Sequence, residues 1–188
     1  MSRPYKIRIS RDITRVVHVE DGVTSHLELL PILEAARMRA LLEEQLQADG
    51  FDIEGDVATK EVEDELDLVV NMATSEVSLK IQGEHHLEKK VDAVVYGDTD
   101  YGDNSEVRKR ATEGLERDAN RELDADAKEL QRMATAKLEG KLRDMGREIN
   151  RITGEVTKAA LKEKAASMGD IDAMSEGTDG SMEIKVRL

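Results

Sequence analysis

The chain has 188 residues, of which 37% are charged and 2% are aromatic, with a formal net charge of −13 and no cysteine. Sequence-independent binding to DNA or RNA is disfavoured, because attraction to phosphate needs a positive field. The lack of cysteine excludes disulfides, thiolate metal sites and cysteine catalysis. With so few aromatic residues the core must be aliphatic and modest, which favours a small β layer plus exposed helix over one large globule.

The first thirty residues predict strands separated by a turn. Residues 5–9 alternate apolar and polar side chains, and residues 13–19 are rich in β-branched types. Asp21-Gly22 is a strong short turn signal. We therefore expect the chain to reverse there and to return as a strand over 23–29.

A medium helix is expected over 34–49, because its apolar residues recur at helical spacing. Gly50 is well placed to end the helix, and Phe51 can fold back on its last turn.

More strand signals follow this helix. An acidic stretch turns at Gly55-Asp56, and the best hairpin pairs 66–72 with 77–81, since both runs alternate apolar and polar residues. One more strand is expected over 91–96. A loop over 97–103 then leads to the next helix, for which Asn104 or Ser105 is a plausible N-cap.

A long, highly charged helix is predicted from 104 to 166. Its second part carries a narrow apolar stripe that resembles a coiled-coil seam. Such a stripe is longer than a small β module can cover, so we expect part of it to pair with another polypeptide. The predicted interaction residues are Leu130, Leu138, Leu142, Met145, Ile149, Ile152 and Val156.

Between Val107 and Ala127 the apolar residues recur every four positions. Each step overshoots the helical period of about 3.6 residues, so this part of the stripe slides around the helix. We expect two consecutive pieces, over 104–124 and 125–167, either fused into one rod or folded back as a pair. Four internal glycines weaken the helix, and they could mark close helix contacts.

Residues 169–188 predict a C-terminal hairpin around a Thr-Asp-Gly turn. The predicted class is α+β, with a mostly antiparallel sheet, one medium helix, one long helical segment and this hairpin. The expected domains are a β-rich module over 1–102, the helical segment over 103–168, and a hairpin over 169–188 that joins the sheet.

The candidate chemistry is sparse. His85 and His86 lie among glutamates and could ligate a metal, but neighbouring strand residues point to opposite faces, so solvent-facing residues in a turn are the better explanation. His18 and His26 flank the predicted turn and could pair across strands. The acidic loop over 98–103 departs from the EF-hand pattern. No nucleotide-binding, zinc-protease or serine-hydrolase motif occurs, so we expect no catalytic residues, no cofactor and no metal.

Two stretches resemble known families. Residues 15–33, followed by Arg37-Met38 and Leu41-Leu42, resemble the start of proteins encoded in bacterial FtsH ternary system gene clusters, which accompany an FtsH-like AAA+ ATPase. Residues 161–166 and 180–188 are similar to the end of a small uncharacterised family of cyanobacteria and plastids that also occurs near AAA+ genes. The resemblance covers about a third of the chain and implies an accessory to an ATPase.

The favoured hypothesis is a non-enzymatic, cytoplasmic interaction or adaptor protein that associates through its long helix and β module. The expected partners are a copy of itself, another protein or an AAA+ ATPase, and neither nucleic acid nor membrane. The alternative is a small metal- or ligand-binding protein, or an unfamiliar enzyme, that uses His85, His86 and the loop over 98–103. A filament or shell component is the third hypothesis.

Overall fold

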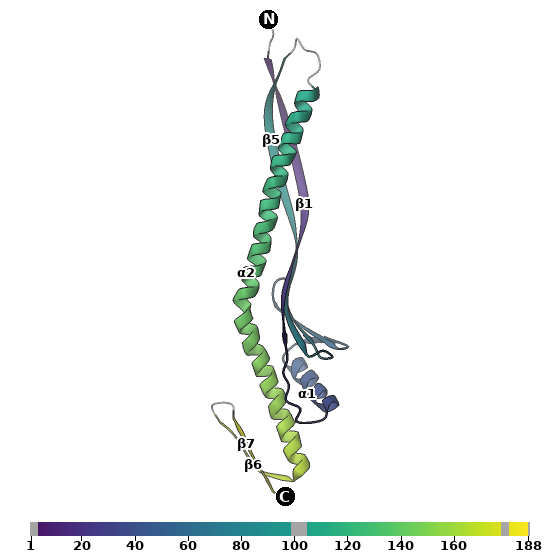
Figure 1. Cartoon of the computed structure of the whole chain (residues 1–188), viewed down its shortest axis with the longest axis vertical. Helices are drawn as coiled ribbons and strands as arrows, with labels where there is room; N and C mark the ends of the chain where they lie inside the picture. The colour runs from purple at the N-terminus through teal and green to yellow at the C-terminus, as the bar shows by residue number, and fades with distance from the viewer. Residues whose placement is uncertain (1–3, 99–104, 178–180, 188) are drawn as a thin grey trace. The chain divides into compact units, whose positions relative to one another are not determined.

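The computed structural model describes residues 4–98, 105–177 and 181–187, and its class is α+β, as predicted (Figure 1). In chain order the elements are β1 (Pro4–His26), α1 (Ala35–Ala48), β2 (Asp52–Glu54), β3 (Val57–Glu63), β4 (Leu66–Asn71), β5 (Glu76–Asp98), α2 (Ser105–Met168), β6 (Asp170–Glu176) and β7 (Met182–Arg187). Five strands form one antiparallel sheet in the order β1-β5-β4-β3-β2, and β6 pairs with β7 in a separate two-stranded sheet. The prediction that the C-terminal hairpin joins the main sheet is therefore wrong.

The strand β1 runs without interruption through the predicted turn at Asp21-Gly22. Gly22 has a different purpose here: a Cβ atom at this position would lie 3.3 Å from the carbonyl oxygen of Leu79, so glycine allows β1 and β5 to approach closely. The turn prediction is wrong because a glycine within a strand and a glycine in a turn give the same sequence signal.

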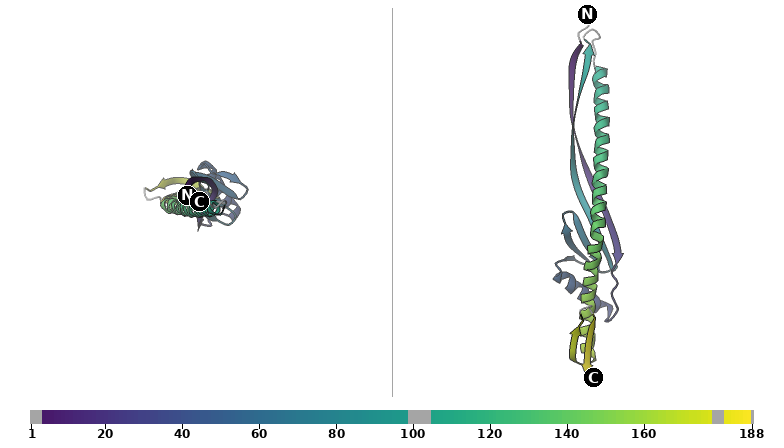
Figure 2. Two further views of the ribbon diagram at one scale, coloured as in Figure 1. Left: turned by 90° about the horizontal axis from the view of Figure 1, so that it is seen from above. Right: turned by 90° about the vertical axis from the view of Figure 1, so that its left-hand side faces the viewer.

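The strand β5 joins the two strands predicted over 77–81 and 91–96 into one element of 23 residues. His18 contacts Glu84, Gln82 contacts Glu20, and Thr24 contacts Ser78. These three contacts share one register, so residues 18–24 of β1 and 78–84 of β5 pair without a slip. Figure 2 shows the two strands crossing over each other as a twisted ribbon.

The chain divides into two compact units, and the division differs from the predicted domains. Unit 1 comprises residues 1–20 and 82–136, and unit 2 comprises residues 21–81 and 137–188. The elements β1, β5 and α2 each contribute residues to both units. The predicted boundaries followed changes in secondary structure, whereas the compact units combine parts of a helix with parts of strands.

In unit 1 one face of the β1/β5 ribbon packs on α2. Ala119 and Leu123 of the helix are fully buried there. Arg15 pairs with Asp124 at the border of this contact, and Lys89 pairs with Glu122 at 3.0 Å. A twisted ribbon offers a surface whose direction turns along its length, and this explains how one face can follow an apolar stripe that slides around a helix.

In unit 2 the core lies between the sheet, α1 and the second half of α2. The predicted hairpin forms as β4 and β5, with the register Leu66↔Ile81 to Asn71↔Glu76. The predicted helix end is also confirmed. Gly50 has a φ of 82°, and the buried Phe51 donates its backbone N–H to the carbonyl oxygen of Leu46, as in a Schellman motif.

The helix α2 is one continuous element of 64 residues rather than a folded-back pair. Its glycines do not mark close contacts with the described residues, because a Cβ atom at Gly114, Gly140, Gly146 or Gly154 would meet none of their atoms within 4 Å apart from the neighbouring backbone of the helix itself.

Candidate interaction site

Four of the seven predicted interaction residues of α2 lie in the chain's own core. Leu138 is 2% exposed, Ile152 1% and Val156 1%, and Met145 is also buried. Leu130, Leu142 and Ile149 are half-buried. The chain itself thus buries four of these seven side chains, whereas the other three keep part of their surface exposed. Association through these residues stays a prediction. The burial of Leu138, Met145, Ile152 and Val156 is explained by the chain itself, without a partner.

Ion pairs fix the second half of α2 to the rest of unit 2. Arg37 of α1 donates from Nε to both carboxylate oxygens of Glu163, at 3.0 and 2.8 Å. Arg151 lies 2.8 Å from Asp49 at the end of α1 and 3.0 Å from Glu148 on its own helix. Glu148 in turn lies 3.3 Å from the ammonium group of Lys60 on β3. This chain of charges joins α1, α2 and β3.

The candidate metal residues are separated by strand geometry. His85 and His86 lie in the middle of β5, and their alternating burial places them on opposite faces of the ribbon. Glu84 lies between His86, at 3.3 Å, and His18, at 3.6 Å, whereas His26 contacts the carbonyl oxygen of Ser75 instead of His18. In the described part of the chain no group of three or more His, Cys, Asp or Glu residues could hold a metal ion.

The acidic loop predicted over 98–103 falls almost entirely outside the described residues. Asp98 is the last residue of β5, and the described chain resumes at Ser105, where α2 begins.

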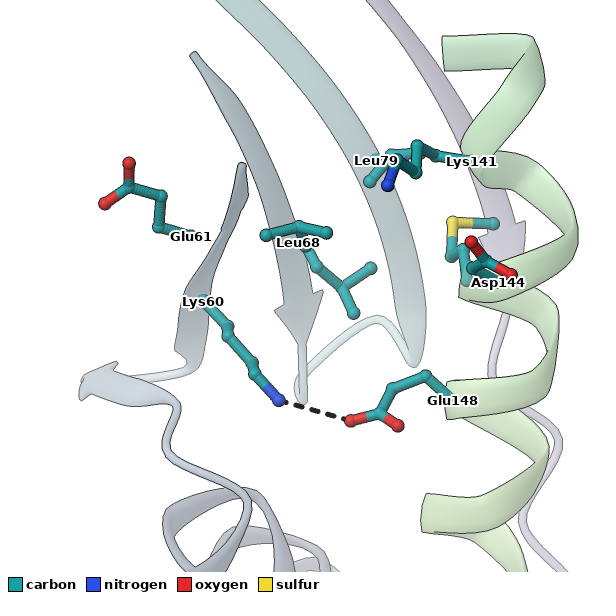
Figure 3. A pocket seen from close by; sticks show the side chains of 9 residues that line it. Lys60, Glu61, Leu68, Leu79, Lys141, Asp144 and Glu148 are labelled. Carbon is teal, nitrogen blue, oxygen red and sulfur yellow. Dashed lines mark hydrogen bonds and ion pairs between the residues drawn. The ribbon is translucent and has the colours of Figure 1, made fainter. Parts of the chain in front are cut away.

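A cleft of about 300 Å³ lies in unit 2 between β3 and α2 (Figure 3). Leu68 of β4 and Leu79 of β5 form its apolar floor. The wall on the strand side consists of Lys60, Glu61 and Val62, and the wall on the helix side consists of Lys141, Asp144, Met145 and Glu148. The cleft thus combines an apolar interior with a charged rim, as in sites that bind a side chain or a small ligand.

Two ion pairs join β3 to α2 beside the cleft, and the strand supplies the base in one pair and the acid in the other. Lys60 of β3 reaches Glu148, as Figure 3 shows, while Glu63 of β3 pairs with Lys141. Lys137 donates to the backbone carbonyl oxygen of Asp64 at 2.6 Å and holds the end of β3 in place. Lys60 and Lys141, the two lysines that line the cleft, are therefore each paired with a glutamate on the opposite wall.

A β-bulge shapes the strand wall. The register between β3 and β4 shifts between Glu61, opposite Asp67, and Glu63, opposite Leu66, so Val62 is the extra residue. Without the bulge Glu63 would point away from α2. With it, Glu63 shares a face with the buried Leu66 and reaches Lys141. Val62 is left 41% exposed at the rim.

The electrostatics of the site favour its ionised pairs. Hydrogen bonding to Glu63 raises the pKa of Lys141, and the same bond lowers the pKa of Glu63. A hydrogen bond from Arg151 is the largest effect on Glu148 and lowers its pKa, with a further contribution from Lys60. For Asp49, desolvation alone would raise the pKa, but hydrogen bonds from Arg151 and Gln45 outweigh it and lower the pKa.

Sequence reasoning missed this cleft. Lys60, Glu61 and Val62 lie in the acidic stretch that follows Gly55-Asp56, and Asp144 and Glu148 are two of the many charged residues of α2, so neither set stands out as a site. One signal was present: Val62 and Leu66 are the only apolar residues between Lys60 and Asp67.

Comparison with known proteins identifies the family. No curated protein and no solved structure matches the chain. In the described part of the chain no helix is long and apolar enough to cross a membrane. A family model described as FtsH ternary system domain X5 matches residues 1–188, and so extends well beyond the two stretches that carry the sequence resemblance. The chain therefore belongs to the FtsH ternary system domain X5 family.

Proposed function

We propose that this protein is a non-enzymatic accessory component of the FtsH ternary system, and that it binds a partner polypeptide. The family match over the whole chain is the observation that carries the proposal. The sequence resemblance implies that an FtsH-like AAA+ ATPase is encoded with such proteins. Any step that consumes energy then belongs to the ATPase, and this chain supplies a binding surface.

The proposed binding surface is the cleft of unit 2 rather than the stripe of α2. The larger side chains of the stripe stabilise the fold, since Leu138, Ile152 and Val156 are at most 2% exposed. The cleft instead has an exposed rim, an apolar floor and fixed charges on two rigid elements, β3 and α2. Sites on rigid elements lose little conformational entropy when they bind.

Co-purification tests this proposal. The tagged full-length chain is expressed together with the complete gene cluster and isolated with ATP or with a non-hydrolysable analogue, and retained proteins are identified by mass spectrometry. We expect the AAA+ ATPase or another product of the cluster to be retained. The control bait is an unrelated protein of similar size and net charge. If both baits retain the same proteins, or if neither retains a product of the cluster, the proposal is wrong.

A further inference from the structure

The C-terminal hairpin is a two-stranded sheet with an incompletely covered apolar face. Among the described strands β6 and β7 pair only with each other, so each has one open edge. The apolar residues of both strands share one face, namely Ile171, Met174, Met182, Ile184 and Val186. Ile171 is 37% exposed and Met174 42%, so the chain itself covers this face only in part. Two-stranded hairpins are marginally stable in water, and additional strands stabilise them.

The two open edges differ in their capacity to pair with another strand. The register of β6 shifts between Ile171 and Ala173, which makes Asp172 the extra residue of a bulge. The strand β6 also contains acidic residues and no basic one. A bulge and uncompensated charge both prevent pairing at an edge. The strand β7 has no bulge, and its exposed and half-buried residues alternate regularly, so its edge is the one that can accept a further strand.

The charges of β7 are complementary to those of a second copy of β7. In an antiparallel pair, residues that lie opposite each other both direct their backbone groups to the partner strand or both away from it. A symmetric pair of β7 strands is therefore centred on one residue that lies opposite its own copy. Centred on Ile184, the pair places Glu183 of each copy opposite Lys185 of the other. Centres on Glu183, Lys185 or Val186 bring like charges opposite each other, which destabilises strand pairing.

Glu183 and Lys185 are both accessible to a second copy. Their side chains are 68% and 70% exposed, and they lie 3.6 Å apart along the strand. Arg187, by contrast, pairs with Asp172 of its own hairpin. The charges that would select a partner are therefore the two that flank Ile184.

From these observations we propose that two copies of this chain associate by antiparallel pairing of their β7 strands, centred on Ile184. The four strands then form one sheet in the order β6-β7-β7-β6. Met182 of each copy lies opposite Val186 of the other, so the two apolar faces become continuous and neighbouring strands cover more of each side chain. This association goes beyond the proposed function, because the partner is the chain itself.

Exchange of charges tests the pairing by analytical ultracentrifugation of the full-length chain at increasing protein concentration. Contact between about five residues of each strand buries a small area, so we expect a wild-type dimer with a Kd of roughly 10–1000 μM. Lys185→Glu and Glu183→Lys each place like charges opposite each other, and each variant alone should associate at least tenfold more weakly. An equal mixture of the two variants restores both opposite-charge pairs and should associate as the wild type does.

The control Lys162→Glu makes the same change in net charge at an exposed position of α2, and it should associate like the wild type. The inference is overturned if the wild type stays monomeric up to about 1 mM, or if the mixture associates no better than its two components. If the melting temperature rises with protein concentration equally in the wild type and in Lys185→Glu, association belongs to another surface, such as the stripe of α2, and the inference is wrong.

Single cysteines test the register, since the natural chain has none. Ile184→Cys places a thiol opposite its own copy, where the Cβ atoms are about 4.5–5.5 Å apart and close to the range that a disulfide spans. Met182→Cys lies on the same face, but its two copies are four residues apart along the strands, or about 13 Å. We expect mild oxidation to link only Ile184→Cys into a covalent dimer. Equal linking of both variants, or linking of neither, overturns the inference.

Discussion

Single residues in this chain join elements that are distant in sequence. Arg151 contacts Asp49, which ends α1, and Glu148, which also binds Lys60 of β3. Lys60 in addition lies over the ring of Phe51, 5.3 Å from its centroid. Hydrogen bonds to charged groups at partly buried positions are worth about 1.5–3 kcal/mol, which is more than exposed ion pairs contribute.

Replacement of Arg151 by Met should change the pH dependence of stability. A carboxylate whose pKa is lower in the folded state stabilises the fold above its unfolded pKa, and this contribution is lost as pH falls through the folded value. Arg151 lowers the pKa of Glu148 below its ordinary 4.5 and helps to lower the pKa of Asp49 below 3.8. We expect Arg151→Met to reduce the free energy of unfolding by about 1–2 kcal/mol at pH 7.

The difference between this variant and the wild type should shrink as pH falls below about 4.5, because both carboxylates then become protonated. Urea unfolding followed by circular dichroism between pH 7 and pH 3 measures it. Arg143→Met, an exposed position on the same helix, is the control. A difference that stays constant with pH would show that Arg151 acts through packing and not through its charge.

Two glycines in or after α2 should respond oppositely to alanine. At Gly154 a Cβ atom meets open space, so Gly154→Ala should stabilise the helix by up to about 1 kcal/mol. At Gly169, between α2 and β6, a Cβ atom would overlap the backbone carbonyl oxygen of Arg187. Gly169→Ala should therefore displace the end of β7, and hydrogen exchange of the β7 amides should become faster. Unchanged exchange in β7 would contradict this contact.

At the scale of elements, α2 is a core helix over most of its length. Its first half meets a two-stranded ribbon and its second half meets a sheet face and α1. Its low fraction of apolar residues gives the appearance of an exposed rod. The strands supply the large apolar side chains that are scarce in the helix, since their inward-facing residues include Ile7, Val19, Leu79 and Ile81, all of them buried.

The stripe should accordingly behave as a core. Ile152→Ala is expected to lower the free energy of unfolding by about 2–5 kcal/mol, because the side chain is 1% exposed and its removal leaves a cavity. Met133→Ala, at a position 60% exposed on the same helix, should change it by less than about 0.5 kcal/mol. If the stripe instead mediated association, the melting temperature of the wild type would rise with protein concentration.

At the scale of the whole molecule, one strand passes through two different environments. In unit 2, β5 lies between β1 and β4, and its residues Val77, Leu79 and Ile81 are at most 3% exposed. In unit 1, residues 83–95 of β5 pair only with β1 among the described strands, and their inward-facing side chains are half-buried. Local stability follows buried apolar contact, so it should differ along a single strand.

Hydrogen exchange measured by NMR or mass spectrometry tests this difference. The amides of residues 77–81 should exchange at rates close to those set by global unfolding, while the amides of residues 83–95 should exchange at least tenfold faster. Equal protection throughout β5 would mean that both units unfold in one cooperative step, contrary to this prediction.

The sequence by itself determined the features that depend on local pattern. The hairpin of β4 and β5, the end of α1 at Gly50 and the extent of α2 all follow from alternation, helical spacing and glycine chemistry within a few residues. The family could also be inferred, from the residues between Arg15 and Leu42. These features need no knowledge of what lies across the fold.

Only the tertiary structure decided what covers the stripe of α2, how far β1 and β5 extend, and where the cleft lies. A stripe has the same pattern whether strands of the same chain or a second chain cover it, and Asp21-Gly22 has the same letters in a turn and in a close strand contact. The cleft depends on a register shift at Val62 that turns Glu63 toward Lys141, 78 positions along the chain. Contacts at such separations are set by packing, on which local propensity has little influence.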